Sequence, residues 1–250
     1  MVEKIKTCIC EKFPLSFNNQ LYEFIKEEKR INNASIAART VNLWKPERKI
    51  KVYFSIFNEN PKIIDEILFV ANEWSKHCSI IFVFEKQKED SDIYVSLKIG
   101  NGFYSAIGLQ SKVYISKNKP SMNLDPSWGL KFGFSKRKEL KFKYCKSLVL
   151  HEFGHSLGLI HEHQRSNRPF AWDKRYIKEN YLKLGMPTVK SARENIFKIC
   201  NVNNTVKSRF DYKSIMIYPF DKKMVKERFG IQIPLGLSKN DKIKISKFYP

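Results

Sequence analysis

One run of residues constrains this chain more than any other feature: HEFGHSLGLIH, at positions 151–161. Histidines at i and i+4 lie on one face of a helix, so His151 and His155 can reach the same metal ion. Gly158 can adopt the left-handed conformation that ends a helix and turns the chain back, which brings His161 toward that ion. The run therefore predicts a helix, a sharp turn and a metal ion held between them.

The number of ligands indicates the kind of metal site. Three protein ligands leave one coordination position open, which is typical of a catalytic zinc ion rather than a structural one. Glu152 follows the first ligand and is placed to take a proton from a water molecule at that position. We expect one Zn²⁺ per chain, and we interpret the two other histidines, His77 and His163, as ordinary core residues.

Hydrophobic periodicity predicts the elements of the first half of the chain. The alternation over Lys49–Ile56 is that of a half-buried strand. Asn60 and Pro61 are typical of a helix start, and a stripe of apolar residues follows them. Two further strands are predicted at Ser79–Phe84 and Ile93–Leu97. This order of elements predicts a sheet covered by a long helix.

Two motifs in this sequence resemble those of a known protein family. The extended run at 151–165, HEFGHSLGLIHEHQR, resembles the metzincin zinc endopeptidases, and Glu162 after the third histidine points to their astacin branch. The block SIMIY at 214–218 has the form of the astacin Met-turn. The resemblance implies that Met216 forms a hydrophobic floor beneath the histidines. It also implies that Tyr218 is a switchable fifth ligand whose phenol stabilises the oxyanion.

The resemblance also implies a fold and an activity. The fold would be an α+β metzincin, with a mixed twisted sheet and two long helices in an upper lobe (41–160) and an irregular lower lobe (161–250) that ends in a helix. Residues 41–250 would form the catalytic domain of a zinc-dependent endopeptidase that acts on protein or peptide substrates, with Glu152 as general base. A catalytically silent zinc-binding module of the same fold is the alternative.

Three further elements are expected along the chain. The stretch after position 100, rich in glycine and proline, is interpreted as loops around a short edge strand at Ser121–Leu124. In the relatives such an edge binds extended substrate as an added antiparallel strand, and an ordinary loop over the sheet is the alternative here. The second long helix is expected over roughly Tyr144–Leu157, and Ser238 with Asp241 is expected to cap the final helix.

The sequence departs from the astacin pattern after Glu162. The family often continues x-x-R-x-D-R-D, whereas Arg165 and Arg168 are kept here and Asn167 and Pro169 replace the two acids. In mature animal astacins the glutamate at the position of Glu162 pairs with a new N-terminus that removal of a propeptide creates. The family's aspartate-bearing propeptide motif and its usual cysteine pairing are not found in this sequence, so the same activation is not expected here. We therefore expect Glu162 to pair with one of the two arginines.

The first 40 residues and the cysteines allow two interpretations. Residues 1–40 are polar and irregular, and we interpret them as a leader or a short pro-like segment. The chain has five cysteines, an odd number, and the pair Cys8-x-Cys10 has the only spacing that hints at a metal ligand. Mostly reduced thiols are expected, while a cysteine of this pair that caps the zinc ion is the alternative.

Composition excludes some classes of partner. The chain has 46 basic and 25 acidic residues, a formal net charge of +21, but its lysines are scattered and no arginine-rich arm exists. We expect a solvated basic surface on a monomer, with no specific nucleic acid as partner. If part of this charge surrounds the cleft expected between the two lobes, acidic substrate residues would be favoured, with Arg165, Arg168 and the lysines of the lower lobe as contacts. No transmembrane or Sec signal segment is expected, which favours the cytoplasm or a non-Sec export route.

Overall fold

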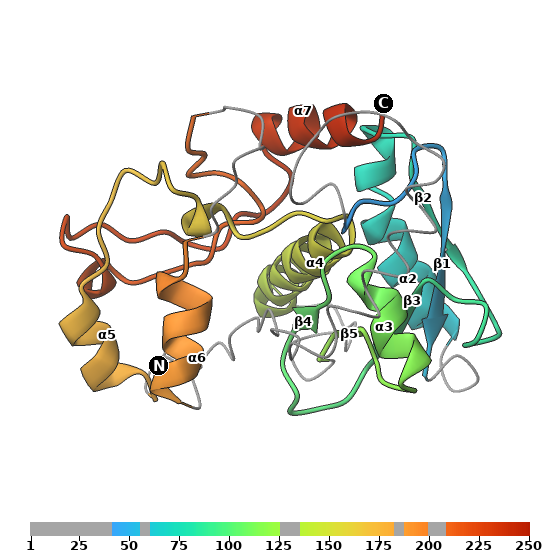
Figure 1. Cartoon of the computed structure of the whole chain (residues 1–250), viewed down its shortest axis with the longest axis horizontal. Coiled ribbons are helices and arrows are strands. Elements are labelled where there is room, and N and C mark those ends of the chain that lie inside the picture. The colour runs from blue at the N-terminus through green and yellow to red at the C-terminus, as the bar shows by residue number, and fades with distance from the viewer. Residues whose placement is uncertain (1–41, 56–60, 126–135, 183–187, 200–208) are drawn as a thin grey trace.

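The computed structural model describes residues 42–55, 61–125, 136–182, 188–199 and 209–250. The leader predicted at 1–40, with Cys8 and Cys10, lies outside these residues. Figure 1 shows a sheet with its helices on one side of the view and a region of long loops and short helices on the other. The two regions correspond in general form to the α+β arrangement expected from the sequence.

Five strands form one sheet in the order β2-β1-β3-β5-β4. Their bounds are Lys49–Phe54 (β1), Ile81–Phe84 (β2), Ile93–Ser96 (β3), Tyr104–Ser105 (β4) and Met122–Asn123 (β5). All pairs are parallel except β4 with β5, which is antiparallel, so the sheet is mixed. Ile50, Val52 and Phe54 are fully buried while their neighbours are not, which confirms the predicted alternation in β1.

The edge strand predicted at Ser121–Leu124 is wrong in its position. Met122 pairs with Val95 of β3 on one side and with Ser105 of β4 on the other, so β5 is an inner strand. The edge on this side is β4, a two-residue strand too short to produce an alternating pattern in the sequence. Helix α3 (Gln110–Ser116) also lies in the stretch that the sequence indicated as loops.

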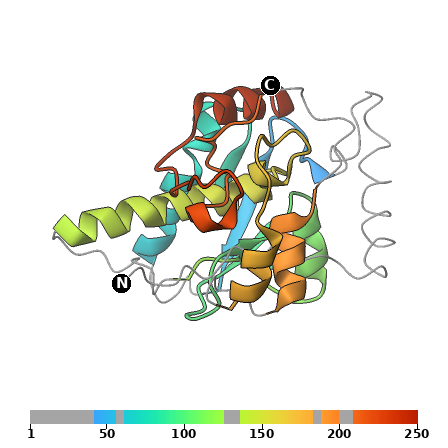
Figure 2. The ribbon, with the colours of Figure 1, turned by 90° about the vertical axis from the view of Figure 1, so that its left-hand side faces the viewer.

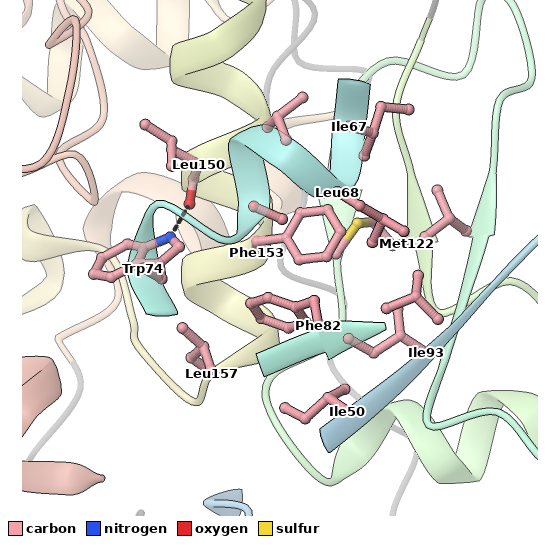
Figure 3. Close-up of a cluster of buried hydrophobic side chains, with 14 of the residues drawn as sticks. Ile50, Ile67, Leu68, Trp74, Phe82, Ile93, Met122, Leu150, Phe153 and Leu157 are labelled. Atoms are coloured by element: carbon pink, nitrogen blue, oxygen red, sulfur yellow. Dashed lines mark hydrogen bonds between the residues drawn. The ribbon is translucent and has the colours of Figure 1, made fainter. Parts of the chain in front are cut away.

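Two helices pack against the sheet and each other. Helix α2 (Pro61–Ala71) begins at the predicted proline, and α4 (Lys136–Ser156) begins eight residues before the expected Tyr144. Figure 3 shows the side chains between them and the sheet, where the Nε1 of Trp74 donates a hydrogen bond of 2.9 Å to the carbonyl oxygen of Leu150. This bond ties the short helical turn after α2 to the middle of α4.

Residues from distant parts of the chain hold the end of α4 in place. Gly158 has a φ of +90°, so it ends the helix as predicted, in the left-handed region that favours glycine. The indole of Trp44 donates to the carbonyl oxygen of Ser156 at 2.7 Å, and the hydroxyl of Tyr249 donates to that of Leu157 at 2.8 Å. These two donors satisfy carbonyl groups that a helix end leaves without an internal partner.

The second half of the described chain is built mainly of loops and short helices. It contains α5 (Lys174–Asn180), α6 (Val189–Ala192), a π-helical turn (Arg193–Phe197), and 3-10 turns at Glu162–Gln164 and Lys222–Met224. A separate hydrophobic cluster stabilises it. The cluster consists of Phe170, Trp172, Ile177, Ala192, Ile196, Phe220, Met224 and Val225. None of the described helices combines the length and apolar character that a membrane crossing requires.

The last helix, α7 (Lys239–Phe248), returns to the first half of the molecule. Ser238 and Asp241 form the predicted capping box, with each side chain accepting a hydrogen bond from the backbone of the other residue. Ile245 and Tyr249 are fully buried in the same hydrophobic cluster as the sheet and α4. Figures 1 and 2 both show α7 above α4. The main core therefore includes residues from both sides of position 160, where the sequence suggested a lobe boundary.

Removing the hydroxyl of Tyr249 tests how strongly the end of α4 is held. Burial raises the pKa of the Tyr249 phenol, so the hydroxyl remains a neutral donor in the native protein. The Tyr249→Phe substitution leaves the Leu157 carbonyl and the Trp44 amide without this buried partner. We expect the free energy of unfolding to fall by about 1–3 kcal/mol in urea titrations. Tyr212→Phe, at a tyrosine that is 46% exposed, is the control and should stay within about 0.5 kcal/mol.

Candidate metal centre

The three histidines of the motif meet in one buried cluster. His151 and His155 lie on α4, and the turn at Gly158 brings His161 against them. The Nε2 atom of His161 lies 3.1 Å from that of His151 and 3.2 Å from that of His155. These atoms form a group that can hold a metal ion, and all three residues are buried. The predicted convergence of the three side chains is confirmed.

The hydrogen-bond partners of the rings show that the cluster fits a cation. The Nδ1 atoms of His151 and His155 lie 2.7 and 2.9 Å from backbone carbonyl oxygens, which can only accept, so each Nδ1 carries the hydrogen. Their Nε2 atoms then present lone pairs, and His161 could donate to only one of them. A metal ion satisfies all three, and nitrogen ligands of a tetrahedral zinc ion lie roughly 3.3–3.4 Å apart, close to the distances found here.

Glu152 is next to the first histidine in the sequence, and Tyr218 packs against the third. Glu152 directly follows His151 on α4, and its side chain is fully buried. Tyr218 is 8% exposed, and its ring centre lies 6.1 Å from that of His161 in an edge-on arrangement. A carboxylate and a phenol can both donate or accept protons, which makes these two buried residues candidates for proton transfer.

The Met-turn packs directly against the ligand helix. Gly154 lies between the two helical histidines, and a Cβ atom built on it would collide with the Sδ atom of Met216. The carbonyl oxygen of Met216 accepts a hydrogen bond of 2.9 Å from the amide of Glu162, next to His161. The carbonyl oxygen of Ile215 faces Nδ1 of His151. The turn therefore contacts both chain segments that carry the three histidines.

Buried ion pairs surround Glu162. Its carboxylate contacts Arg165 at 2.9 Å, which confirms one of the two predicted pairings. It also contacts Lys244 of α7 at 2.8 Å, and it accepts a hydrogen bond of 3.1 Å from the amide of Asp211. Lys244 was not predicted, because 82 residues separate it from Glu162 and no local pattern connects them. Arg165 is engaged here with its side chain only 11% exposed, which argues against the expected contact with substrate.

Arg168 and the two remaining histidines have other surroundings. Arg168 donates to the carbonyl oxygen of His163 at 3.4 Å, and burial lowers the pKa of its guanidinium. His163 is fully buried, stacks on His161 with ring centres 5.0 Å apart, and has its Nε2 atom 2.8 Å from the carbonyl oxygen of Asn195. His77 is half-buried, and burial lowers its pKa. Both histidines lie outside the metal cluster. The prediction of a core residue is confirmed for His163 and wrong for His77, which is only half-buried.

Asp241 contributes more than the predicted helix cap. Its carboxylate accepts a hydrogen bond of 2.6 Å from the hydroxyl of Ser214 and one of 2.7 Å from the amide of Ile215. Burial raises the pKa of this carboxyl group, and the neighbouring donors oppose that effect. The capping pattern in the sequence located the residue, but nothing in it indicated that the same carboxylate reaches the Met-turn.

Adding one methyl group between α4 and the Met-turn tests their contact. In Gly154→Ala the new Cβ must displace Met216, and Trp74 lies 3.1 Å away on the same side. We expect overpacking to lower the free energy of unfolding by about 1–3 kcal/mol, measured by urea denaturation. Gly236→Ala is the control, since no atom lies within 4 Å of a Cβ at that position. Equal effects at both glycines would contradict the close contact.

Comparisons with known proteins agree with this geometry. The family model for the astacin peptidases, described as Astacin, matches residues 142–232. Astacin-like metalloprotease toxin 5 of Loxosceles gaucho is 28% identical over 134 residues, which cover 53% of this chain and 56% of the toxin. Astacin-like metalloprotease toxin 4 of Loxosceles laeta is 39% identical over 71 residues, which cover 28% of this chain and 54% of that relative. The chain spans about half the length of these two relatives.

Solved structures match over a larger part of the chain. Myroilysin has 28% sequence identity and a TM-score of 0.68, and the match covers 84% of this chain and 96% of myroilysin. High choriolytic enzyme 1 of Oryzias latipes, a hatching enzyme zinc-protease, has 18% identity and a TM-score of 0.56 over 85% of this chain and 96% of its own, a likeness of fold alone. Together with the histidine cluster and the Met-turn, these matches show that the chain is similar to the astacin-like metzincins in sequence and in fold.

Proposed function

We propose that the protein is a zinc-dependent endopeptidase that hydrolyses peptide bonds in protein substrates. The observation behind this proposal is the buried cluster of three Nε2 atoms, with Glu152 beside its first ligand. The relatives from Loxosceles are astacin-like metalloproteases by name, and the fold matches those of myroilysin and of a hatching enzyme zinc-protease. Both points support the same chemistry for this site.

His151, His155 and His161 would hold the ion. A zinc ion bound by three histidines supplies Lewis-acid chemistry, because it polarises carbonyl groups and lowers the pKa of water. The carbonyl oxygens that accept from Nδ1 of His151 and His155 fix the orientation of those two rings, so the ligands are arranged before the ion binds.

Glu152 is the residue that would move the proton. It would take a proton from the attacking water as general base and pass it to the leaving amine as general acid. Its position on α4 directly after His151 places it on the ligand helix, with a side chain that is fully buried. Zinc binding alone needs no carboxylate there, so its presence favours an enzyme over a silent zinc-binding module of the same fold.

Tyr218 would stabilise the negative charge that develops on the carbonyl oxygen. A phenol beside the metal ligands can donate a hydrogen bond to that oxygen in the transition state.

An extended substrate would add to the sheet at β4, the strand at the edge that contacts α4, rather than at β5. The loop before β4 is fixed by Asp125, whose carboxylate accepts from the amides of Gly100 and Gly102 at 2.7 and 3.1 Å.

Replacing Glu152 tests the proposed activity most directly. Glu152→Gln keeps the shape of the side chain but removes the base, so hydrolysis of a peptide library, followed by mass spectrometry, should slow by about 10²–10⁴-fold. Metal analysis should still find one zinc ion per chain. Glu179→Gln, at an exposed glutamate of α5, is the control and should keep wild-type rates. Wild-type turnover in Glu152→Gln would refute the assignment of the base.

Replacing Tyr218 separates transition-state binding from structure. If the phenol donates mainly to the oxyanion, Tyr218→Phe should lower kcat and kcat/KM together by about 10²–10³-fold with little change in KM. The comparison variant is Tyr212→Phe, at an exposed tyrosine near the same turn. A loss of melting temperature with unchanged specific activity would instead indicate a purely structural tyrosine.

A further inference from the structure

We infer that Asp241, on the C-terminal helix α7, is a positioning residue for the metal ligand His151, and that it acts through the backbone of the Met-turn. The inference concerns the site described above and rests on its proposed ability to bind zinc. Among the contacts of the described residues, those of Asp241 reach the Met-turn and not the histidines, so its effect must pass through Ser214 and Ile215.

The carboxylate of Asp241 is enclosed by donors. It is 1% exposed, and one of its oxygens accepts from the Ser214 hydroxyl at 2.6 Å. The other oxygen accepts from the Ile215 amide at 2.7 Å and from the Ser238 amide at 3.0 Å. Two of these three donors belong to the Met-turn, and the third belongs to the cap of α7.

The same contacts fix the peptide group that faces His151. That group consists of the Ile215 carbonyl and the Met216 amide. The carbonyl lies 2.7 Å from Nδ1 of His151, and the amide donates to the Ser214 hydroxyl oxygen at 3.1 Å. Because the Ser214 hydroxyl gives its own hydrogen to Asp241, its oxygen is left to accept from Met216. Asp241 therefore orients Ser214, and Ser214 orients the peptide plane whose carbonyl holds the imidazole.

Breaking this chain of hydrogen bonds from Asp241 through Ser214 to the Ile215 carbonyl should weaken metal affinity more than it lowers the stability of the fold. A carbonyl oxygen on Nδ1 fixes the tautomer and direction of a ligand imidazole, and losing such a partner typically weakens metal affinity by about 10–100-fold. An asparagine at position 241 offers one acceptor oxygen and an amide that can only donate, so it cannot accept from both Ser214 and Ile215 in the same way.

Asp241 also belongs to the capping box of α7, so a purely structural role must be separated from positioning. Two serines make this possible. Ser238→Ala removes the cap hydroxyl, which accepts from the Asp241 amide at 3.0 Å and donates to Asp211 at 2.6 Å, but it leaves the contacts of Asp241 with the Met-turn. Ser214→Ala removes the relay and leaves the cap. A positioning role predicts weaker zinc binding in Ser214→Ala than in Ser238→Ala, whereas a purely structural role predicts no such difference.

The experiment measures zinc affinity by competition with a chromogenic chelator, at a temperature well below the melting point of every apo-protein. We expect Asp241→Asn and Ser214→Ala to raise the zinc dissociation constant about 10–100-fold. Ser238→Ala should melt at a lower temperature but bind zinc within about threefold of wild type. Cobalt(II) spectra provide a second readout, since altered ligand-field bands in Asp241→Asn and Ser214→Ala, but not in Ser238→Ala, report a changed first ligand.

Two results would overturn the inference. Wild-type zinc affinity in Ser214→Ala, or an equal loss of affinity in all three variants, would show that Asp241 only stabilises the fold. If Asp241→Asn fails to fold, Ser214→Ala against Ser238→Ala still decides the question. Because the readout is metal affinity rather than hydrolysis, a chain without peptidase activity would still give the expected order of affinities if the inference holds.

Discussion

The metal centre depends on where α4 ends. Two ligands lie on the helix and the third lies after it, so the three Nε2 atoms meet only if the chain turns sharply at Gly158. Such a turn leaves carbonyl groups without helical partners. The indole of Trp44 and the hydroxyl of Tyr249 satisfy two of them. The position of the third ligand is thus set by hydrogen bonds from residues near both ends of the described chain.

Buried ion pairs, in addition to the hydrophobic core, hold the segment after the third histidine in place. The segment after the third histidine, EHQRSNR at 162–168, consists of polar and charged residues, and its buried Glu162 contacts Arg165 and Lys244. Burying such charges is favourable only when each has partners, and removing one partner leaves an uncompensated charge. The ionic contacts therefore favour one arrangement of this segment against α7 over alternatives in which Glu162 would lose its cations. Asp241, one turn before Lys244, holds the Met-turn to the same helix.

Local patterns in the sequence predicted local features, but they could not predict contacts between residues that lie far apart in the chain. The histidine spacing, the alternation in β1 and the Ser238–Asp241 cap each depend on residues within a few positions, where helix or strand periodicity decides the geometry. The inner position of β5 depends on the two-residue β4, too short for a pattern. The Lys244–Glu162 pair and the link from Asp241 to Ser214 depend on tertiary packing, which no local pattern encodes.

These long-range contacts couple metal binding to folding of the whole domain. The side chains that hold the helix end, the Met-turn and Glu162 come from Trp44, Asp241, Lys244 and Tyr249, so the ligand geometry exists only when the first strand region and α7 are both in place. An ion that binds this native arrangement and not the unfolded chain stabilises the native state by an amount that grows with its concentration. Losing the contacts of α7 with the Met-turn and with Glu162 should therefore weaken metal binding, although the helix contributes no ligand.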